Sequence, residues 1–201
     1  NEMSIEDKIG QLFFVVGQDS NTVNLSEFTK KYRPGGIMYR PDKAAKIKDE
    51  VSKIQKASDI PLFVAANLES GGNGIASEGT WLGTPMEMAA TGDFQSAYQL
   101  GRISGYEAAQ VGVNMSFAPI VDIDMNFKNP IMNVRTFGSD KNRVIGMSSA
   151  QAKGLEECGI IPVIKHFPGD GVDERDQHLL SSVNSLQADE WMESYGQIYR
   201  S

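Results

Sequence analysis

The sequence of 201 residues predicts an α/β fold built on a parallel β-sheet. Two observations lead to this prediction. Short, continuously apolar runs recur along the chain, and longer amphipathic segments separate them. Runs without polar alternation are typical of parallel strands that are buried on both faces. The alternation of the two kinds of segment is typical of βα units that are joined by right-handed crossovers.

The apolar runs and the amphipathic segments give the predicted elements in order. The predicted strands are Leu12–Val16, Gly36–Tyr39, Pro61–Ala66, Val113–Ile123 and Ile160–His166. The predicted helices are Asp42–Ser58, Asp93–Val111, Asn142–Glu157 and Ala188–Arg200. In the first of these helices, Ile47, Val51 and Ile54 recur at the spacing of one helical face. Gly159 follows the third helix, in the position where glycine commonly ends a helix.

Two architectures fit this order of elements. One is a five-stranded doubly wound sheet, and the other is the first five βα units of an eight-stranded barrel. Hydrophobic periodicity does not separate them. A complete barrel typically needs about 250 residues, so a barrel would be incomplete within this chain. No internal repeat or interdomain linker divides residues 1–201, which indicates one domain.

Composition and charge exclude several classes of function. The net charge is −7, and the lysines between residues 43 and 56 alternate with acidic residues, as on a solvated helix face. We therefore expect no nucleic-acid partner. The single cysteine, Cys158, excludes an internal disulfide, and no apolar run approaches the roughly 18 residues of a membrane span. The prediction is a cytoplasmic protein, although Asn1 in place of Met is also compatible with a secreted or lipoprotein form whose leader has been removed.

Polar side chains gather just after three of the predicted strands. Asn67 and Glu69 follow the third strand, Asp122 and Arg135 follow the fourth, and Lys165 and His166 end the fifth. The carboxyl ends of parallel strands meet at one edge of a sheet or one mouth of a barrel. These residues are therefore expected to converge on one pocket.

The segment after the fifth strand carries the strongest signal. Both histidines of the chain, His166 and His178, lie in it. The glycines and proline between them indicate a tight loop with close backbone approach. Asp176 and His178 are separated by one residue, so the carboxylate can hold one ring nitrogen while the other faces a substrate.

Here the sequence resembles a known family. The segment Lys165–Gly171 (KHFPGDG), followed by Asp176-Gln177-His178, is similar to the signature of family 3 glycoside hydrolases of the β-N-acetylglucosaminidase branch. Three further segments are similar and follow the family's order: Ile5–Leu12, Ser116–Ile123 and Arg135–Gly138. The similarity extends over essentially the whole chain.

The resemblance implies a TIM-type (β/α)8 barrel, of which this chain holds about the first five β/α units. It also implies a retaining hydrolase that removes terminal β-linked N-acetylglucosamine from a carbohydrate substrate. In the roles it implies, His178 is the general acid/base and Asp176 orients its ring. The implied sugar-binding residues are Asn67, Arg135, Lys165 and His166. The implied chemistry needs no cofactor and no metal.

Three departures from the family pattern qualify this expectation. Asn67 stands where the family usually has an Asp that holds the non-reducing end of the sugar, and it lacks the charge. Asn73 and its neighbours stand where an Arg is usual. The family's nucleophilic Asp follows the seventh barrel strand, and the 201 residues hold no substitute for it. We therefore expect a partial barrel domain over residues 1–201, with negligible glycosidase activity on its own.

Several alternatives stay open at this point. The chain could be a non-catalytic carbohydrate-binding or regulatory protein, or a β-glucosidase-like member of the family. A doubly wound nucleotide binder is disfavoured because no G-x-G-x-x-G follows the first strand. A metal site at His166, Asp170, Asp173 and His178 is disfavoured by irregular spacing. Arg135 could instead pair with Asp140, and Glu69 could merely hold loop backbone.

Overall fold

The computed structural model describes residues 3–17 and 24–201. Within these ranges one sheet holds five strands in chain order. The strands are β1 (Phe14–Val16), β2 (Gly36–Met38), β3 (Phe63–Ala66), β4 (Met115–Ser116) and β5 (Ile161–Pro162). Every neighbouring pair is parallel. The sheet confirms the predicted α/β class. Because its strand order never reverses, it is the order of a barrel and not of a doubly wound sheet.

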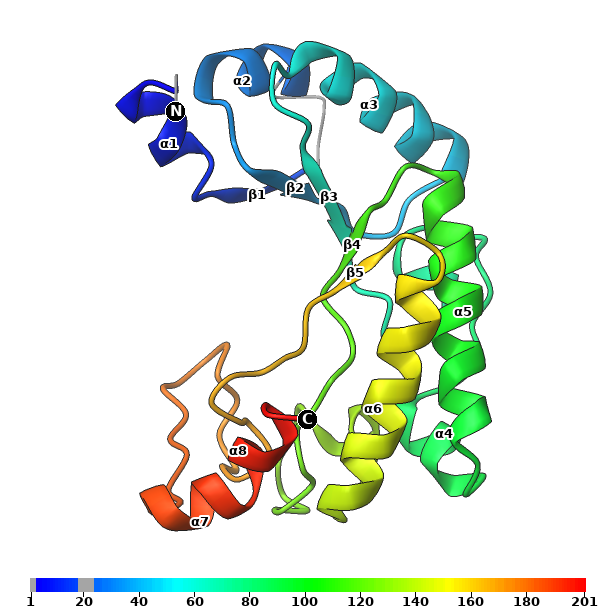
Figure 1. Ribbon diagram of the computed structural model, residues 1–201, viewed down its shortest axis with the longest axis vertical. Helices are drawn as coiled ribbons and strands as arrows, with labels where there is room; N and C mark the ends of the chain where they lie inside the picture. The colour runs from blue at the N-terminus through cyan, green and yellow to red at the C-terminus, as the bar shows by residue number, and fades with distance from the viewer. Residues whose placement is uncertain (1–2, 18–23) are drawn as a thin grey trace.

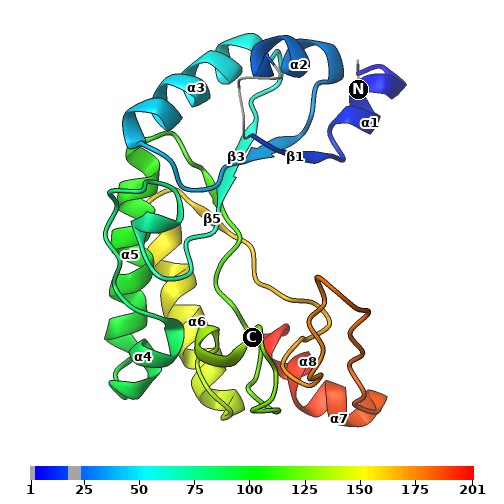
Figure 2. The same cartoon turned by 180° about the vertical axis from the view of Figure 1, so that it is seen from behind.

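The helices cover one side of this curved sheet. The longer ones, α2, α3, α5 and α6, lie along its convex side, and the segment from β5 to α8 bends toward the concave side (Figures 1 and 2). Their bounds are α1 (Ile5–Gly10), α2 (Leu25–Tyr32), α3 (Ala44–Ala57), α4 (Pro85–Ala90), α5 (Phe94–Gln110), α6 (Lys141–Glu156), α7 (Ala188–Glu193) and α8 (Tyr195–Ile198). None of the described helices is long and apolar enough to cross a membrane.

The two faces of the sheet have different surroundings. Alternate strand residues such as Ile37, Val64 and Ala66 are fully buried in a core shared with α3 and α5. The residues between them point to the concave face, where Phe14 and Phe63 remain 41% and 42% exposed and stack with ring centroids 6.2 Å apart. This alternation decides which side chains after each strand belong to the concave side.

The fourth and fifth strands are shorter than predicted. The ladder from β4 to β3 stops after the Phe117 N–H donates to the Ala66 carbonyl, because Pro119, the next residue on that side, has no N–H to donate. Pro162 leaves the ladder to β4 intact, since Ile161 and Val163 donate to the Asn114 and Ser116 carbonyls on either side of it. The two segments nevertheless stay side by side beyond the strands. The Val121 N–H donates to the Lys165 carbonyl at 2.7 Å, and the Lys165 N–H donates to the Pro119 carbonyl at 3.2 Å. Lys165 therefore keeps its place at the end of β5 although it lies outside the strand.

The predicted helices agree with α3, α5 and α6 to within about two residues at each end. The predicted helix Ala188–Arg200 is wrong as a single element, because it is interrupted at Ser194. The Ser194 hydroxyl donates to the Glu190 carbonyl at 2.7 Å, and this local bond competes with a regular helix. Three helices lie outside the ranges predicted from periodicity, α1, α2 and α4. Each carries an N-cap, from Ser4, Asn24 and Thr84, and Pro85 opens α4.

Candidate active site

The ends of β2 and β3 open the site on the concave face. Met38 pairs with Ala65, so Arg40 and Asn67, each two residues further on, are level with one another on the same face. Both line a cavity of about 300 Å³ together with Glu69 and Ser70. Arg40 is exposed, and no described side chain forms an ion pair with it.

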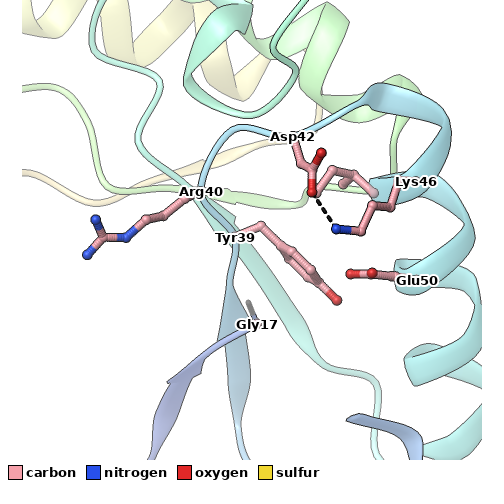
Figure 3. Close-up of a pocket in the computed structure, with 7 residues that line it drawn as sticks. Gly17, Tyr39, Arg40, Asp42, Lys46 and Glu50 are labelled. Atoms are coloured by element: carbon pink, nitrogen blue, oxygen red, sulfur yellow. Dashed lines mark hydrogen bonds and ion pairs between the residues drawn. The ribbon is translucent and has the colours of Figure 1, made fainter. Parts of the chain in front are cut away.

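A second cavity lies on the opposite side of β2, of about 290 Å³, lined by Tyr39, Asp42, Lys46 and Glu50 among others. Figure 3 shows Arg40 pointing away from these side chains. Tyr39 is 1% exposed and packs in the core, and burial, followed by the nearby Glu50, raises the pKa of its hydroxyl. Arg40 lines both cavities, and its guanidinium points away from the charged side chains of the outer one.

Glu69 is the centre of a charged cluster. Its carboxylate accepts two hydrogen bonds from Arg135, at 2.9 Å each, and one from the Lys165 ammonium at 2.5 Å. Lys165 also donates to the side-chain oxygen of Asn67 at 3.3 Å. The cluster joins the ends of β3 and β5 to the 3-10 turn that contains Arg135, and its three charged side chains are 15–30% exposed.

The charges of this cluster stabilise one another. Burial raises the pKa of the Glu69 carboxyl, but Arg135 and Lys165 outweigh it and hold that pKa below its ordinary value. Burial lowers the pKa of the Lys165 ammonium, although Glu69 opposes the effect. Glu69 is therefore ionised at neutral pH. The Lys165 ammonium and the Arg135 guanidinium beside it present charged hydrogen-bond donors to the concave face.

His166 is held by the buried carboxylate of Asp122. The distance from His166 Nδ1 to Asp122 Oδ2 is 2.6 Å, and Asp122 is fully buried. Asp122 also accepts the backbone N–H groups of His166 and Asp170, at 3.2 and 2.6 Å. These bonds fix the loop and the ring together. Because Nδ1 is occupied, Nε2 of His166 is the nitrogen left for a ligand.

His178 and Asp176 form a second pair on a neighbouring loop. Nδ1 of His178 lies 2.7 Å from an oxygen of Asp176, which also accepts the His178 backbone N–H at 2.9 Å. The backbone bond, then the ring, lowers the pKa of the Asp176 carboxyl. The imidazole is 68% exposed, and no residue in the described part of the chain bonds its Nε2. A cavity of about 220 Å³ lined by His166, Asp170 and Gln177 separates the two loops.

The predicted site residues thus fall into three groups. Asn67, Arg135 and Lys165 meet at Glu69, His166 adjoins them in sequence, and the His178 pair stands apart. Within the described part of the chain, His178 contacts none of the first group. The structure pairs Arg135 with Glu69 instead of Asp140, which caps α6. Residues 3–17 and 24–201 contain no group of three or more side chains placed to bind a metal ion.

Three residues of the site were not assigned a role from the sequence. They are Arg40, the hub carboxylate Glu69 and Asp122, the partner of His166. The sequence already placed Glu69 and Asp122 among the polar residues near the ends of the third and fourth predicted strands, but Arg40, directly after the second, was overlooked. A search for charges at the carboxyl end of every predicted strand would have included Arg40.

A curved parallel sheet with charged and polar side chains at its carboxyl edge defines an α/β-barrel enzyme site. Residues 4–201 match the family model of the glycosyl hydrolase family 3 N terminal domain. The chain therefore belongs to glycosyl hydrolase family 3, as the sequence resemblance predicts, and its five β/α units are part of that family's TIM-type barrel.

Relatives and solved structures similar to this chain carry the names of enzymes that act on glycosides. The chain is 42% identical over 199 residues to a β-N-acetylglucosaminidase/β-glucosidase of Cellulomonas fimi, covering 99% of this chain and 35% of that protein. It is 30% identical to β-hexosaminidase LpqI of Mycobacterium tuberculosis, covering 88% of this chain and 46% of the relative. A solved structure, β-glucoside phosphorylase BglX bound to 2FGlc, superposes with a TM-score of 0.95 at 49% identity, over 99% of this chain and 36% of that one. The chain thus spans less than half the length of these relatives.

Proposed function

We propose that the protein containing these residues is a retaining glycosidase that removes terminal β-linked N-acetylglucosamine. The hydrogen-bonded pair His178–Asp176 is the observation that carries the proposal. It offers a free Nε2 on a loop that faces the His166 loop across a small cavity. An imidazole can both give and take a proton near neutral pH, and the bond to Asp176 leaves Nε2 as the nitrogen that does so.

In this mechanism Nε2 of His178 protonates the glycosidic oxygen as the aglycone leaves. A carboxylate on the opposite side of the sugar forms the glycosyl-enzyme intermediate. In the second step neutral His178 takes a proton from the attacking water. Asp176 keeps the ring in the required tautomer and stabilises the imidazolium, which is present before the first step and forms again in the second.

The sugar is held by the charged cluster and by His166. Lys165 and Arg135 are charged donors that Glu69 fixes in direction, so they bind hydroxyl oxygens with little loss of side-chain entropy. Asn67 accepts or donates a hydrogen bond beside them. Their common direction toward the concave face supports a sugar bound across the carboxyl ends of β3 and β5.

We further propose that the nucleophile comes from chain outside these 201 residues, which are nearly inactive by themselves. Two carboxylates near the dyad are already engaged or enclosed. Asp173 accepts hydrogen bonds from Arg175 and from the Val183 N–H, and Asp170 is 9% exposed. Neither is available on the opposite face of a sugar.

A second candidate is the phosphorolysis of a β-glucoside. The 49% identical structure named as a β-glucoside phosphorylase supports it, as does Asn67 in place of the family's usual carboxylate. The physical argument is that phosphate carries about two negative charges at neutral pH. A carboxylate base would repel phosphate, whereas a neutral imidazole does not.

The test is hydrolysis of a chromogenic β-N-acetylglucosaminide and the matching β-glucoside, with and without phosphate. The full-length protein and the 201-residue chain are compared. Each is assayed unsubstituted, with His178→Ala, and with the control Leu179→Ala. The Leu179 side chain is 80% exposed on the same loop. We expect cleavage of the N-acetyl substrate by the full-length protein only, with a loss of about 10²–10⁴-fold in His178→Ala alone.

Other outcomes select other functions. Sugar 1-phosphate formation that depends on added phosphate selects the phosphorylase, and preferred cleavage of the glucoside selects a β-glucosidase. If the full-length protein binds sugar but cleaves neither substrate, the protein is a carbohydrate-binding one and the proposal is wrong.

A further inference from the structure

The loop that carries the dyad is fastened at its base by one carboxylate. We define the dyad loop as residues 174–182, between Asp173 and Val183. Oδ2 of Asp173 accepts the Val183 backbone N–H at 2.5 Å, which joins two residues ten positions apart. The same carboxylate accepts hydrogen bonds from Nη2 and Nε of Arg175, at 2.6 and 3.0 Å, and from the Arg175 backbone N–H at 3.1 Å. One side chain therefore holds both the outgoing and the returning arm of the loop.

Asp173 is itself tied to the core. The side-chain amide of Asn129 donates to the backbone carbonyls of Asp173 and Asp170, at 2.7 and 2.6 Å. Asn129 is 2% exposed, and its own oxygen accepts the backbone N–H groups of Ile131 and Met132. A chain of hydrogen bonds thus runs from the segment after β4, through Asp173, to both arms of the dyad loop.

The tip of the loop has much less support than its base. His178 and its neighbours Leu179 and Leu180 expose 68%, 80% and 62% of their areas. Glu174 forms an ion pair with Lys128 at 3.5 Å, but both side chains are at least 60% exposed, and such pairs contribute little. The place of the tip relative to the sugar site is therefore set mainly at the base.

We propose that Asp173 is a positioning residue for the His178–Asp176 pair, acting as a clasp that sets where the dyad loop stands over the sugar. The inference rests on the proposed glycosidase function. Hydrogen bonds from Arg175, followed by the Val183 N–H, hold the pKa of Asp173 well below its usual range, so the clasp is closed throughout the neutral range. Asp173 touches no reacting atom, and its effect reaches the chemistry through the position of His178.

Asp173→Asn is the informative substitution. The amide oxygen can still accept one of the two arms, but the charge that attracts Arg175 is lost. A displacement of about 1 Å at a catalytic group can reduce the rate about 10²-fold. We expect kcat for a substrate with a poor leaving group to fall by about 10–10²-fold, with KM nearly unchanged because the sugar cluster is intact.

The experiment uses the full-length protein with two β-glycosides, an alkyl glycoside and a dinitrophenyl glycoside. Dinitrophenolate leaves without protonation, so the bond-cleaving step for this substrate does not need the acid. The variants are Asp173→Asn, Arg175→Gln, the control Glu174→Gln and His178→Ala. We expect the two clasp variants to lose kcat/KM on the alkyl substrate and to keep most of it on the dinitrophenyl substrate, with Glu174→Gln unchanged. Circular dichroism verifies that each variant is folded.

The outcomes separate this inference from the proposed function. If His178→Ala keeps its activity on the alkyl glycoside, the proposed function fails. If His178→Ala loses that activity while both clasp variants match Glu174→Gln, the clasp alone is refuted. Equal losses on both substrates, or a loss confined to KM, would show a general structural role and would also refute the clasp. Should Asp173→Asn not fold, Arg175→Gln decides the question, since Arg175 is 43% exposed.

Discussion

Replacement of Glu69 by Gln tests whether the charged cluster stabilises the domain. Glu69 accepts three charge-assisted hydrogen bonds, two from Arg135 and one from Lys165, and is 15% exposed. Glutamine keeps the shape but can satisfy only one of the two cations. The other cation is then left partly buried without a counter-charge.

The expected loss follows from the burial and the kind of bond. Removing one partner of a fully buried ion pair costs about 3–5 kcal/mol, and a hydrogen bond to a charged group contributes about 1.5–3 kcal/mol. Because Arg135 is 30% exposed and the amide retains one bond, the lower part of this range applies. We expect the free energy of unfolding to fall by about 2–3 kcal/mol, or the Tm of this domain by about 4–12 °C.

The assay is thermal unfolding of the full-length protein followed by circular dichroism. The control is Asp49→Asn, which removes an ion pair to Lys53 whose two side chains are at least 60% exposed, and which should cost no more than about 0.5 kcal/mol. The pKa of Glu69 is lowered in the folded state, so its contribution is present above about pH 4.3 and is lost as the pH falls through the folded pKa. Equal shifts for the two variants at pH 7 would refute the reasoning.

Three further predictions concern the base of the Lys165–Gly171 loop. Burial, then Asp122, raises the pKa of the Asp170 carboxyl, so the stability of the wild type falls as the pH rises from about 4 through that pKa. Asp170→Asn should therefore raise the Tm at pH 7 but not at pH 4, and a lower Tm at pH 7 would contradict this. Tyr195→Phe leaves the Gly171 N–H without the hydroxyl that accepts it at 3.2 Å, so urea unfolding should show a loss of about 1–2 kcal/mol; no loss would mean that another acceptor replaces it. Gly171→Ala places a methyl group 1.8 Å from the Ile123 carbonyl oxygen, so we expect a loss of at least about 2 kcal/mol in the same assay, and an unchanged midpoint would show that this backbone yields freely.

Much of the fold could be read from the sequence because its signals are local. The apolar runs predicted the core of every strand, and the periodicity around Ile47, Val51 and Ile54 predicted α3. The errors have local causes as well. Pro119 shortened the fourth strand, and the Ser194 hydroxyl divided the last helix. The short helices α1, α2 and α4 lie outside the predicted ranges because their signal is in their caps and not in a long apolar stripe.

The sequence by itself determined the chemical inventory of the site and its order along the chain. Asp176 and His178 could be paired from their spacing, because two residues so near in sequence are held near each other by the backbone. What the tertiary structure decided is which distant charges meet. Glu69 lies 66 positions from Arg135 and 96 from Lys165, and Asp122 lies 44 from His166. Such pairs depend on strand register and on which face each side chain takes, and neither is fixed until the sheet has assembled.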